Sequence, residues 1–212
     1  MATELSVRAA VQLQEYFDQL ACHWDREVSL AGLECLSHII RELDLGPGSR
    51  VLDVGCGTGV LLPLLVEAVG ARGRIAALDF SRNMLLEARA KGFQPIVSLV
   101  QADVTDIPLI DGFAHMVICN SAFPHFGDKA EALKEMARVL RDDGRLVICH
   151  TASRDRINQF HQSIGGAVGA DLLPDEAQLV DLTERTGLRI VYLEDSPTRY
   201  LAIARKAIQV PD

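Results

Sequence analysis

The feature that most constrains the fold is a glycine-rich turn between an apolar run and a helical stretch. Residues 51–59 read VLDVGCGTG, and residues 59–69 continue with helical patterning. Glycine adopts positive φ without steric cost and lets a ligand approach the bare backbone. In α/β proteins the ligand of such a turn lies beyond the carboxyl end of the preceding strand. The turn alone is weak evidence, but it predicts a ligand site at residues 53–59.

Short apolar runs alternate with helical stretches along the chain, which is typical of parallel βαβ units. We expect strands at residues 50–54, 74–79, 96–101, 115–120 and 145–150, and helices at residues 59–69, 81–91 and 129–140. Residues 188–193 and 198–204 are two more expected strands, and their short connection makes them antiparallel. Two amphipathic helices fill residues 1–45. The prediction is a doubly wound α/β fold, with a helical cap at 1–45 and a cofactor-binding domain at 46–212.

Charge and composition narrow the partners. The net charge is −8 and basic residues do not cluster, which argues against a nucleic-acid partner. The longest apolar run, residues 60–66, is too short to span a membrane, and residues 1–4 lack the features of a secretion signal, so we expect a cytoplasmic protein with no membrane partner. The five cysteines are odd in number and most lie within apolar runs, which indicates buried, reduced thiols. No pattern sets the oligomeric state.

Acidic residues at successive strand ends indicate the cofactor. The glycine spacing is G-x-G-x-G, with Val60 where a dinucleotide site has its third glycine, and Asp53 precedes the loop. A carboxylate at that position would repel a pyrophosphate and attract an ammonium group. Asp79 can accept the hydroxyls of a ribose, and Asp103, beside the apolar Val104, can accept from the adenine amine. S-adenosylmethionine has each of these groups and no phosphate.

The sequence resembles the class I S-adenosylmethionine-dependent methyltransferase family, and within it the quinone-biosynthesis C-methyltransferases. The resemblance rests on residues 16–18, 24–25, 53–59, 79–81, 84–85, 102–103, 107–108, 125–128 and 135–140. It departs at Asp142-Asp143-Gly144 and at Ala114, which both concern turns. The resemblance implies a seven-stranded sheet with an antiparallel last strand. It implies that Gly55 and Gly57 contact the methionine part, Asp79 the ribose and Asp103 the adenine region.

The predicted cofactor residues are therefore Asp53, Gly55, Cys56, Gly57, Gly59, Asp79, Phe80, Met84, Asp103, Val104 and Asn120. Methyl transfer is an in-line displacement that depends mainly on orientation, and a base is needed only if the acceptor must lose a proton. Three histidines near the ends of the fourth and fifth strands are candidate bases: His125, His150 and His161. A metal site is not expected, because Cys35 with His38 and Cys22 with His23 lack the tighter paired spacing of zinc sites, and these cysteines read better as core thiols. A metal site built from His125, His150 and His161 is also disfavoured.

Two segments lie outside the βαβ pattern. Residues 13–38 and 153–174 are rich in apolar side chains, and 153–174 is long for a connection, as lids often are. We expect both to fold over the cofactor's methyl group and close around a small-molecule acceptor. The alternative is that both pack on the outside of the sheet.

Three other functions are alternatives. An NAD-dependent oxidoreductase is disfavoured by the glycine spacing and by Asp53. A nucleic-acid methyltransferase is disfavoured by Asn120-Ser121-Ala122-Phe123, where an Asn-Pro-Pro-Tyr type of motif would stand. A partner or regulatory protein that binds S-adenosylmethionine without catalysis stays open, because the chemistry needs no fixed nucleophile.

Overall fold

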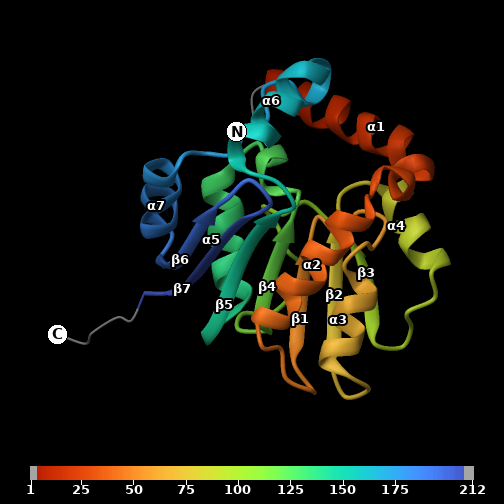
Figure 1. Cartoon of the computed structure of the whole chain (residues 1–212), viewed down its shortest axis with the longest axis vertical. Helices are drawn as coiled ribbons and strands as arrows, with labels where there is room; N and C mark the ends of the chain where they lie inside the picture. Colours follow the sequence, from red (N-terminus) through yellow and green to blue (C-terminus); the bar gives the residue numbers. More distant parts are fainter. Residues whose placement is uncertain (1–3, 208–212) are drawn as a thin grey trace.

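One seven-stranded sheet organises the chain (Figure 1). The structure, a computed structural model, describes residues 4–207, so residues 1–3 of the predicted cap and 208–212 of the predicted domain lie outside the described residues. The strand order is β3-β2-β1-β4-β5-β7-β6, and β7 runs antiparallel to both of its neighbours. The strands are β1 Arg50–Val54, β2 Arg74–Asp79, β3 Val97–Gln101, β4 Ala114–Asn120, β5 Leu140–His150, β6 Leu188–Asp195 and β7 Tyr200–Lys206.

Helices cover both faces of the sheet, which confirms the doubly wound prediction. On one face, α2 (Leu30–Glu42), α3 (Leu62–Val69) and α4 (Arg82–Ala90) bury apolar side chains against β1, β2 and β4. On the other face, α5 (Lys129–Val139) and α7 (Glu176–Arg185) do the same. Strands buried on both faces explain the nearly continuous apolar runs of the sequence.

The remaining helices lie beyond the carboxyl ends of the strands. In Figure 1, α1 (Glu4–Glu27) and α6 (Arg154–Ile164) lie above that edge of the sheet. The short 3-10 helix η2 (Gly166–Val168) follows α6, and η1 (Phe123–His125) follows β4. The two helices of residues 4–45 lie in different places: α1 lies over the edge, whereas α2 packs in the helical layer, where Leu36, Ile39 and Ile40 are buried.

Several element boundaries differ from the sequence predictions. Helix α3 begins at Leu62 and not at residue 59, because Gly59, with φ of 81°, still belongs to the turn. Strand β5 begins at Leu140, which pairs with Ala114 across an irregularity in register. Residues 153–174 are not a plain loop, since Ser153 caps α6. The sequence analysis also missed α7, although Asp175 and Gln178 form the capping box that signals such a start.

The cysteines are free thiols, and their positions differ in burial. Cys56, Cys119 and Cys149 are buried, whereas Cys22 is exposed on α1. The expectation of buried thiols therefore fails for Cys22, because the side chain lies on the outer side of an amphipathic helix.

Candidate active site

A cavity of about 930 Å³ lies where β1, β2, β3 and β4 end, between the sheet edge and α1. This volume is at the upper end of the range of roughly 300–1,000 Å³ found for ligand pockets. Most of the lining comes from the ends of strands and the loops after them, and α1 contributes Leu13, Phe17 and Trp24. The cavity lies where an open α/β sheet places its ligands, at the switch point between β1 and β4.

The glycine loop forms the floor of this cavity and shows why small residues stand there. Gly55 has φ of 68°, and a Cβ atom built on it would lie 2.3 Å from Cβ of Ala122. Gly57, with φ of 53°, faces Trp24 and Met84 across the cavity. Gly59 does not line the cavity within the described residues, and a Cβ there would press into Leu62 at 2.6 Å. Gly59 therefore has a packing role in the structure, unlike its predicted cofactor contact.

Backbone N–H groups of the loop are already used inside the protein. Those of Gly55 and Cys56 donate to the carbonyl of Leu78, at 2.8 and 2.9 Å. The Gly57 N–H donates to Oδ2 of Asp79 at 2.8 Å. A pyrophosphate would need such groups and would meet the Asp79 carboxylate instead. The loop is thus unsuited to the dinucleotide of an NAD enzyme.

Two buried carboxyl groups give the cavity its electrostatic character. Asp53 is 1% exposed, and its Oδ2 has no hydrogen-bond partner among the described residues. Burial and then the nearby charge of Asp79 raise the pKa of Asp53 to about 7. Burial also raises the pKa of Asp79 to about 6, although its carboxylate accepts from the N–H groups of Ser81 and Gly57. A cationic ligand would relieve both groups.

The other charged side chains that line the cavity are acidic too. They are Glu27, Asp103, Asp128 and Asp171, and no lysine or arginine of the described chain lines the cavity. The field therefore favours a cationic cofactor and disfavours an anionic acceptor. An orphaned carboxylate oxygen, an aromatic wall and a close-approach glycine loop together fit the ammonium, sulfonium and nucleoside parts of S-adenosylmethionine.

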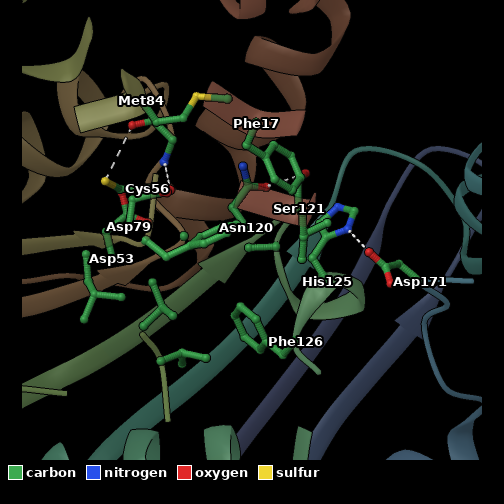
Figure 2. A pocket seen from close by; sticks show the side chains of 18 of the residues that line it. Phe17, Asp53, Cys56, Asp79, Met84, Asn120, Ser121, His125, Phe126 and Asp171 are labelled. Carbon is green, nitrogen blue, oxygen red and sulfur yellow. Dashed lines mark hydrogen bonds and ion pairs between the residues drawn. The ribbon is translucent and has the colours of Figure 1, made fainter. Parts of the chain in front are cut away.

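The other predicted cofactor residues also line the cavity: Cys56, Phe80, Met84, Asp103, Val104 and Asn120. Asp103 is exposed, and its Oδ1 accepts from the N–H and the hydroxyl of Thr105, at 2.8 and 2.7 Å. Asp103 is thus a turn former as well as a candidate adenine contact. The Asn120 side chain lies at the end of β4, near Phe17 and Ser121 (Figure 2).

Ser121, which follows the fourth strand among the candidate residues, has an unusual backbone conformation. It has φ of 57°, a left-handed conformation that costs roughly 1–2 kcal/mol in a residue with a side chain. The Ser121 N–H donates to the carbonyl of Cys149, which holds the bend against β5. The bend ends β4 and turns Ala122 and His125 toward the cavity. Strain of this kind is concentrated at functional sites.

Carboxylates on α1 hold that helix over the cavity. Asp18 Oδ1 accepts from the Ser81 hydroxyl and from the Asn83 N–H, at the start of α4. Asp25 accepts from the Thr58 hydroxyl and pairs with Lys91 at 2.7 Å. Both acids lie in the stretches that carry the family resemblance, and the structure shows that they dock α1 onto the glycine loop and α4.

The three candidate bases have different surroundings. His125 lines the cavity, and its Nδ1 lies 2.8 Å from Oδ2 of Asp171 (Figure 2). His161 lies outside the described lining, and its Nδ1 donates to the carbonyl of Asp171 at 2.6 Å. His150 is 3% exposed and packs against Tyr200, and its Nε2 has no partner among the described residues. Burial lowers the pKa of His150 to about 3. Of the three, the structure brings only His125 to the cavity.

The cap predicted from apolar residues is only partly closed. From residues 13–38, Leu13, Phe17 and Trp24 line the cavity, whereas residues 153–174 contribute Ala167 and Asp171. Phe160, Ile164 and Leu172 of the second segment are 61, 42 and 37% exposed. The expectation that apolar side chains of 153–174 cover the cavity is therefore wrong for these three, because Phe160 and Ile164 lie on the exposed side of α6 and Leu172 lies in an exposed segment after η2.

Within residues 4–207, no three or more His, Cys, Asp or Glu side chains are grouped so that they could hold a metal ion. None of the helices described combines the length and the apolar character that a membrane crossing requires.

The fold and the cavity define an α/β protein that binds a nucleoside cofactor carrying positive charge. Residues 52–148 match the model of the methyltransferase domain family. The demethylmenaquinone methyltransferase of Lysinibacillus sphaericus is 30% identical over 161 residues, which cover 72% of this chain and 67% of that protein. The chain belongs to the class I S-adenosylmethionine-dependent methyltransferase family, and S-adenosylmethionine is the cofactor of this family.

The chain is also similar to two other proteins. An uncharacterized 37.1 kDa protein in transposon TN4556 of Streptomyces fradiae is 37% identical over 134 residues, covering 63% of this chain and 37% of that protein. The chain thus spans at most about two thirds of the length of these two curated relatives. A methyltransferase structure from Aquifex aeolicus has a TM-score of 0.69 and 23% identity, and the match covers 90% of this chain and 97% of that one. It shows a shared fold.

Proposed function

We propose that the protein transfers the methyl group of S-adenosylmethionine to a small, uncharged, largely aromatic acceptor. The observation that carries the proposal is the pair of buried carboxyl groups, Asp53 and Asp79, at the floor of a cavity whose charged lining is all acidic. Isolated buried carboxylates are unfavourable, so a cationic ligand is the best explanation for the pair.

Each part of the cavity has a proposed role. Asp53 binds the ammonium group of the cofactor, Asp79 the ribose hydroxyls, and Asp103 with Val104 the adenine. The bound cofactor supplies a methyl group already activated by its positive sulfur. The chain's own task is to hold an acceptor in line with that carbon, which can contribute roughly 7–11 kcal/mol.

The aromatic wall supports the acceptor class. Phe17 contacts Phe80 and Trp24 edge to face, at ring-centroid distances of 5.9 and 6.0 Å. Phe17, Trp24, Phe80 and Phe126 all line the cavity. Flat apolar compounds pack well against such rings, whereas phosphorylated or carboxylated compounds would meet the acidic lining. A nucleic-acid acceptor is disfavoured for the same reason. The cytoplasmic location of the protein stays a prediction.

Isothermal titration is the first test. We expect S-adenosylhomocysteine and S-adenosylmethionine to bind and NAD not to bind. Binding of NAD with no response to either sulfur compound would refute the cofactor assignment.

Turnover is the second test, and it separates an enzyme from a non-catalytic binding protein. Purified protein is incubated with methyl-labelled S-adenosylmethionine and, one at a time, 1,4-naphthohydroquinone, 2-naphthol, 2-naphthalenethiol and 2-naphthoate. We expect label in neutral acceptors and much less in 2-naphthoate. Binding of the cofactor with no labelled product from a broad neutral panel would favour the non-catalytic alternative.

A further inference from the structure

Asp171 is an acid to which the sequence analysis assigned no role. It follows η2 and lies 46 residues beyond His125 in the chain, yet its Oδ2 is 2.8 Å from Nδ1 of that histidine. The two side chains are 10% (His125) and 21% (Asp171) exposed, and both residues line the cavity (Figure 2). The pair therefore joins the end of β4 to the segment that contains α6 and η2.

Side chains of α6 fix the position of Asp171. Asn158 donates to the carbonyl of Leu173 at 3.1 Å and accepts from the N–H of Leu173 at 2.8 Å. His161 donates to the carbonyl of Asp171 itself. Val168 of η2 is 1% exposed and packs in one cluster with Phe17 of α1. The Asp171 carboxylate is thus placed by the packing of residues 154–173 on the rest of the molecule.

The pairing selects one form of the His125 ring. A carboxylate can only accept, so Nδ1 carries the proton and Nε2 keeps its lone pair. An orienting acid behind a histidine is the arrangement that general bases use in other enzymes. The rings of Phe17 and His125 pack edge to face with their centroids 5.0 Å apart, and this contact further restricts rotation of the His125 ring.

We propose that Asp171 is a positioning residue that holds His125 as a base for an acceptor hydroxyl, and that the base is complete only while residues 154–173 are docked. The proposal rests on the proposed function. A hydroxyl is the acceptor group whose methylation a general base accelerates most. A phenol with a pKa near 10 keeps its proton at neutral pH, whereas a neutral amine attacks through its lone pair without a base.

The proposed step moves one proton and one methyl group. The acceptor O–H bond breaks, and its proton moves to Nε2 of His125. The oxygen forms a bond to the methyl carbon while the carbon–sulfur bond breaks, and that electron pair stays on sulfur, which becomes neutral. His125 then returns the proton to solvent. Asp171 stabilises the transient charge on the ring but keeps its own charge throughout.

The charged surroundings set the direction of the pH effect. Burial lowers the pKa of His125, and the nearby His161 and Lys129 lower it further, whereas Asp171 raises it. His150 at the end of β5 interacts with His125 and His161, and α1 contributes the uncharged Phe17. Loss of the Asp171 charge should therefore lower the pKa of His125 and shift the acid limb of the rate profile to lower pH.

The first experiment reads the ring directly and needs no acceptor. Nitrogen-15 NMR of the histidine side chains, with S-adenosylhomocysteine bound, should show His125 protonated at Nδ1 near pH 7.5. His125→Gln assigns the signal. A ring protonated at Nε2 in the wild-type protein overturns the pairing, whether or not any variant folds.

The second experiment compares Asp171→Asn with Asp155→Asn, a matched change on α6 at an exposed acid paired with Arg154. With 2-naphthol, we expect kcat of Asp171→Asn to fall roughly tenfold to hundredfold, at or below the lower end of the 10²–10⁴-fold contribution of a general base, because His125 itself remains. The acid limb should move to lower pH while the affinity for S-adenosylhomocysteine stays unchanged. With 2-naphthalenethiol, which ionises unaided, kcat should fall far less. Asp155→Asn should behave as wild type.

The outcomes separate the two proposals. If kcat of Asp171→Asn falls equally with both acceptors and the acid limb of its pH–rate profile does not move, Asp171 has a purely structural role and the inference is overturned. Failure of the wild-type protein to methylate any acceptor overturns the proposed function, while the NMR result still decides the pairing.

Discussion

Asp53 and Asp79 are the residues whose chemistry most clearly exceeds what folding requires. Each carboxyl group is almost fully buried, and burial raises its pKa, to about 7 for Asp53 and to about 6 for Asp79. Well-packed apolar residues would stabilise the fold at least as well. Asp79 also holds the glycine loop through the Gly57 N–H, so it shapes the cavity as well as lining it.

Asp79→Ala should weaken binding of S-adenosylhomocysteine by about 1–3 kcal/mol, the usual loss for a hydrogen bond to a charged group. The unfolding temperature should fall too, because the N–H groups of Gly57 and Ser81 lose their acceptor. Isothermal titration measures the first effect. Asp142→Ala serves as the control, since that side chain is 99% exposed at the other end of the sheet. Unchanged affinity in the folded variant would remove Asp79 from the cofactor site.

At the scale of elements, α1 and the segment from α6 to η2 enclose the cavity in different ways. Helix α1 places apolar rings on the cavity and is anchored by Asp18 and Asp25. The segment after β5 reaches the cavity mainly through Asp171, while the outer side of α6 stays exposed. Few contacts hold α6, which is typical of a segment that opens locally.

Ligand binding should therefore slow proteolysis of α6. Trypsin cleavage after Arg154 or Arg156 is expected to slow when S-adenosylhomocysteine is bound, and the fluorescence of Trp24, which lines the cavity, should change. Arg185 at the end of α7 is an exposed internal control whose cleavage should not respond. Equal cleavage at Arg154 and Arg156 in both states, with unchanged Trp24 fluorescence, would mean that the segment does not close on the ligand.

For the whole molecule, the buried acids make stability depend on pH. The Asp53 carboxyl keeps its proton to about pH 7 when folded, whereas an unfolded aspartate loses it near pH 4. Stability contributed by this group is therefore present below about pH 4 and is lost as pH rises through 7. His150 acts in the opposite direction: its folded pKa is about 3, so stability rises with pH up to about 6.5. Asp79, whose pKa is raised to about 6, acts in the same direction as Asp53, so the total pH dependence combines opposing contributions.

A comparison of variants isolates the acid. Asp53→Asn should gain stability relative to the wild-type protein as pH rises from 5 to 8, by on the order of 1–3 kcal/mol. Urea unfolding of the ligand-free protein at both pH values measures the difference. Asp142→Asn, a matched change at an exposed acid, should show no such gain. Parallel pH curves for Asp53→Asn and the wild-type protein would mean that Asp53 ionises normally in the fold.

Local patterns in the sequence predicted much of the architecture. The strands from β1 to β5, the antiparallel pair β6 and β7, and the glycine loop follow from apolar runs and turn residues. These features depend on neighbours within a few positions of the chain, and the resemblance to methyltransferases rests on the same local motifs. The order of acids at successive strand ends was enough to indicate a cationic nucleoside cofactor.

Only the tertiary structure decided which distant side chains meet. No local pattern distinguishes His125, at the cavity, from His150, buried behind Tyr200. No spacing links Asp171 to His125, because the two are 46 positions apart and α5, β5 and α6 lie between them, so that only the packing of these elements brings the pair together. Likewise α1 and α2 are both amphipathic, yet one covers the cavity and the other joins the sheet layer. Periodicity records which face of a helix is apolar, whereas the surface that buries it is set by the rest of the fold.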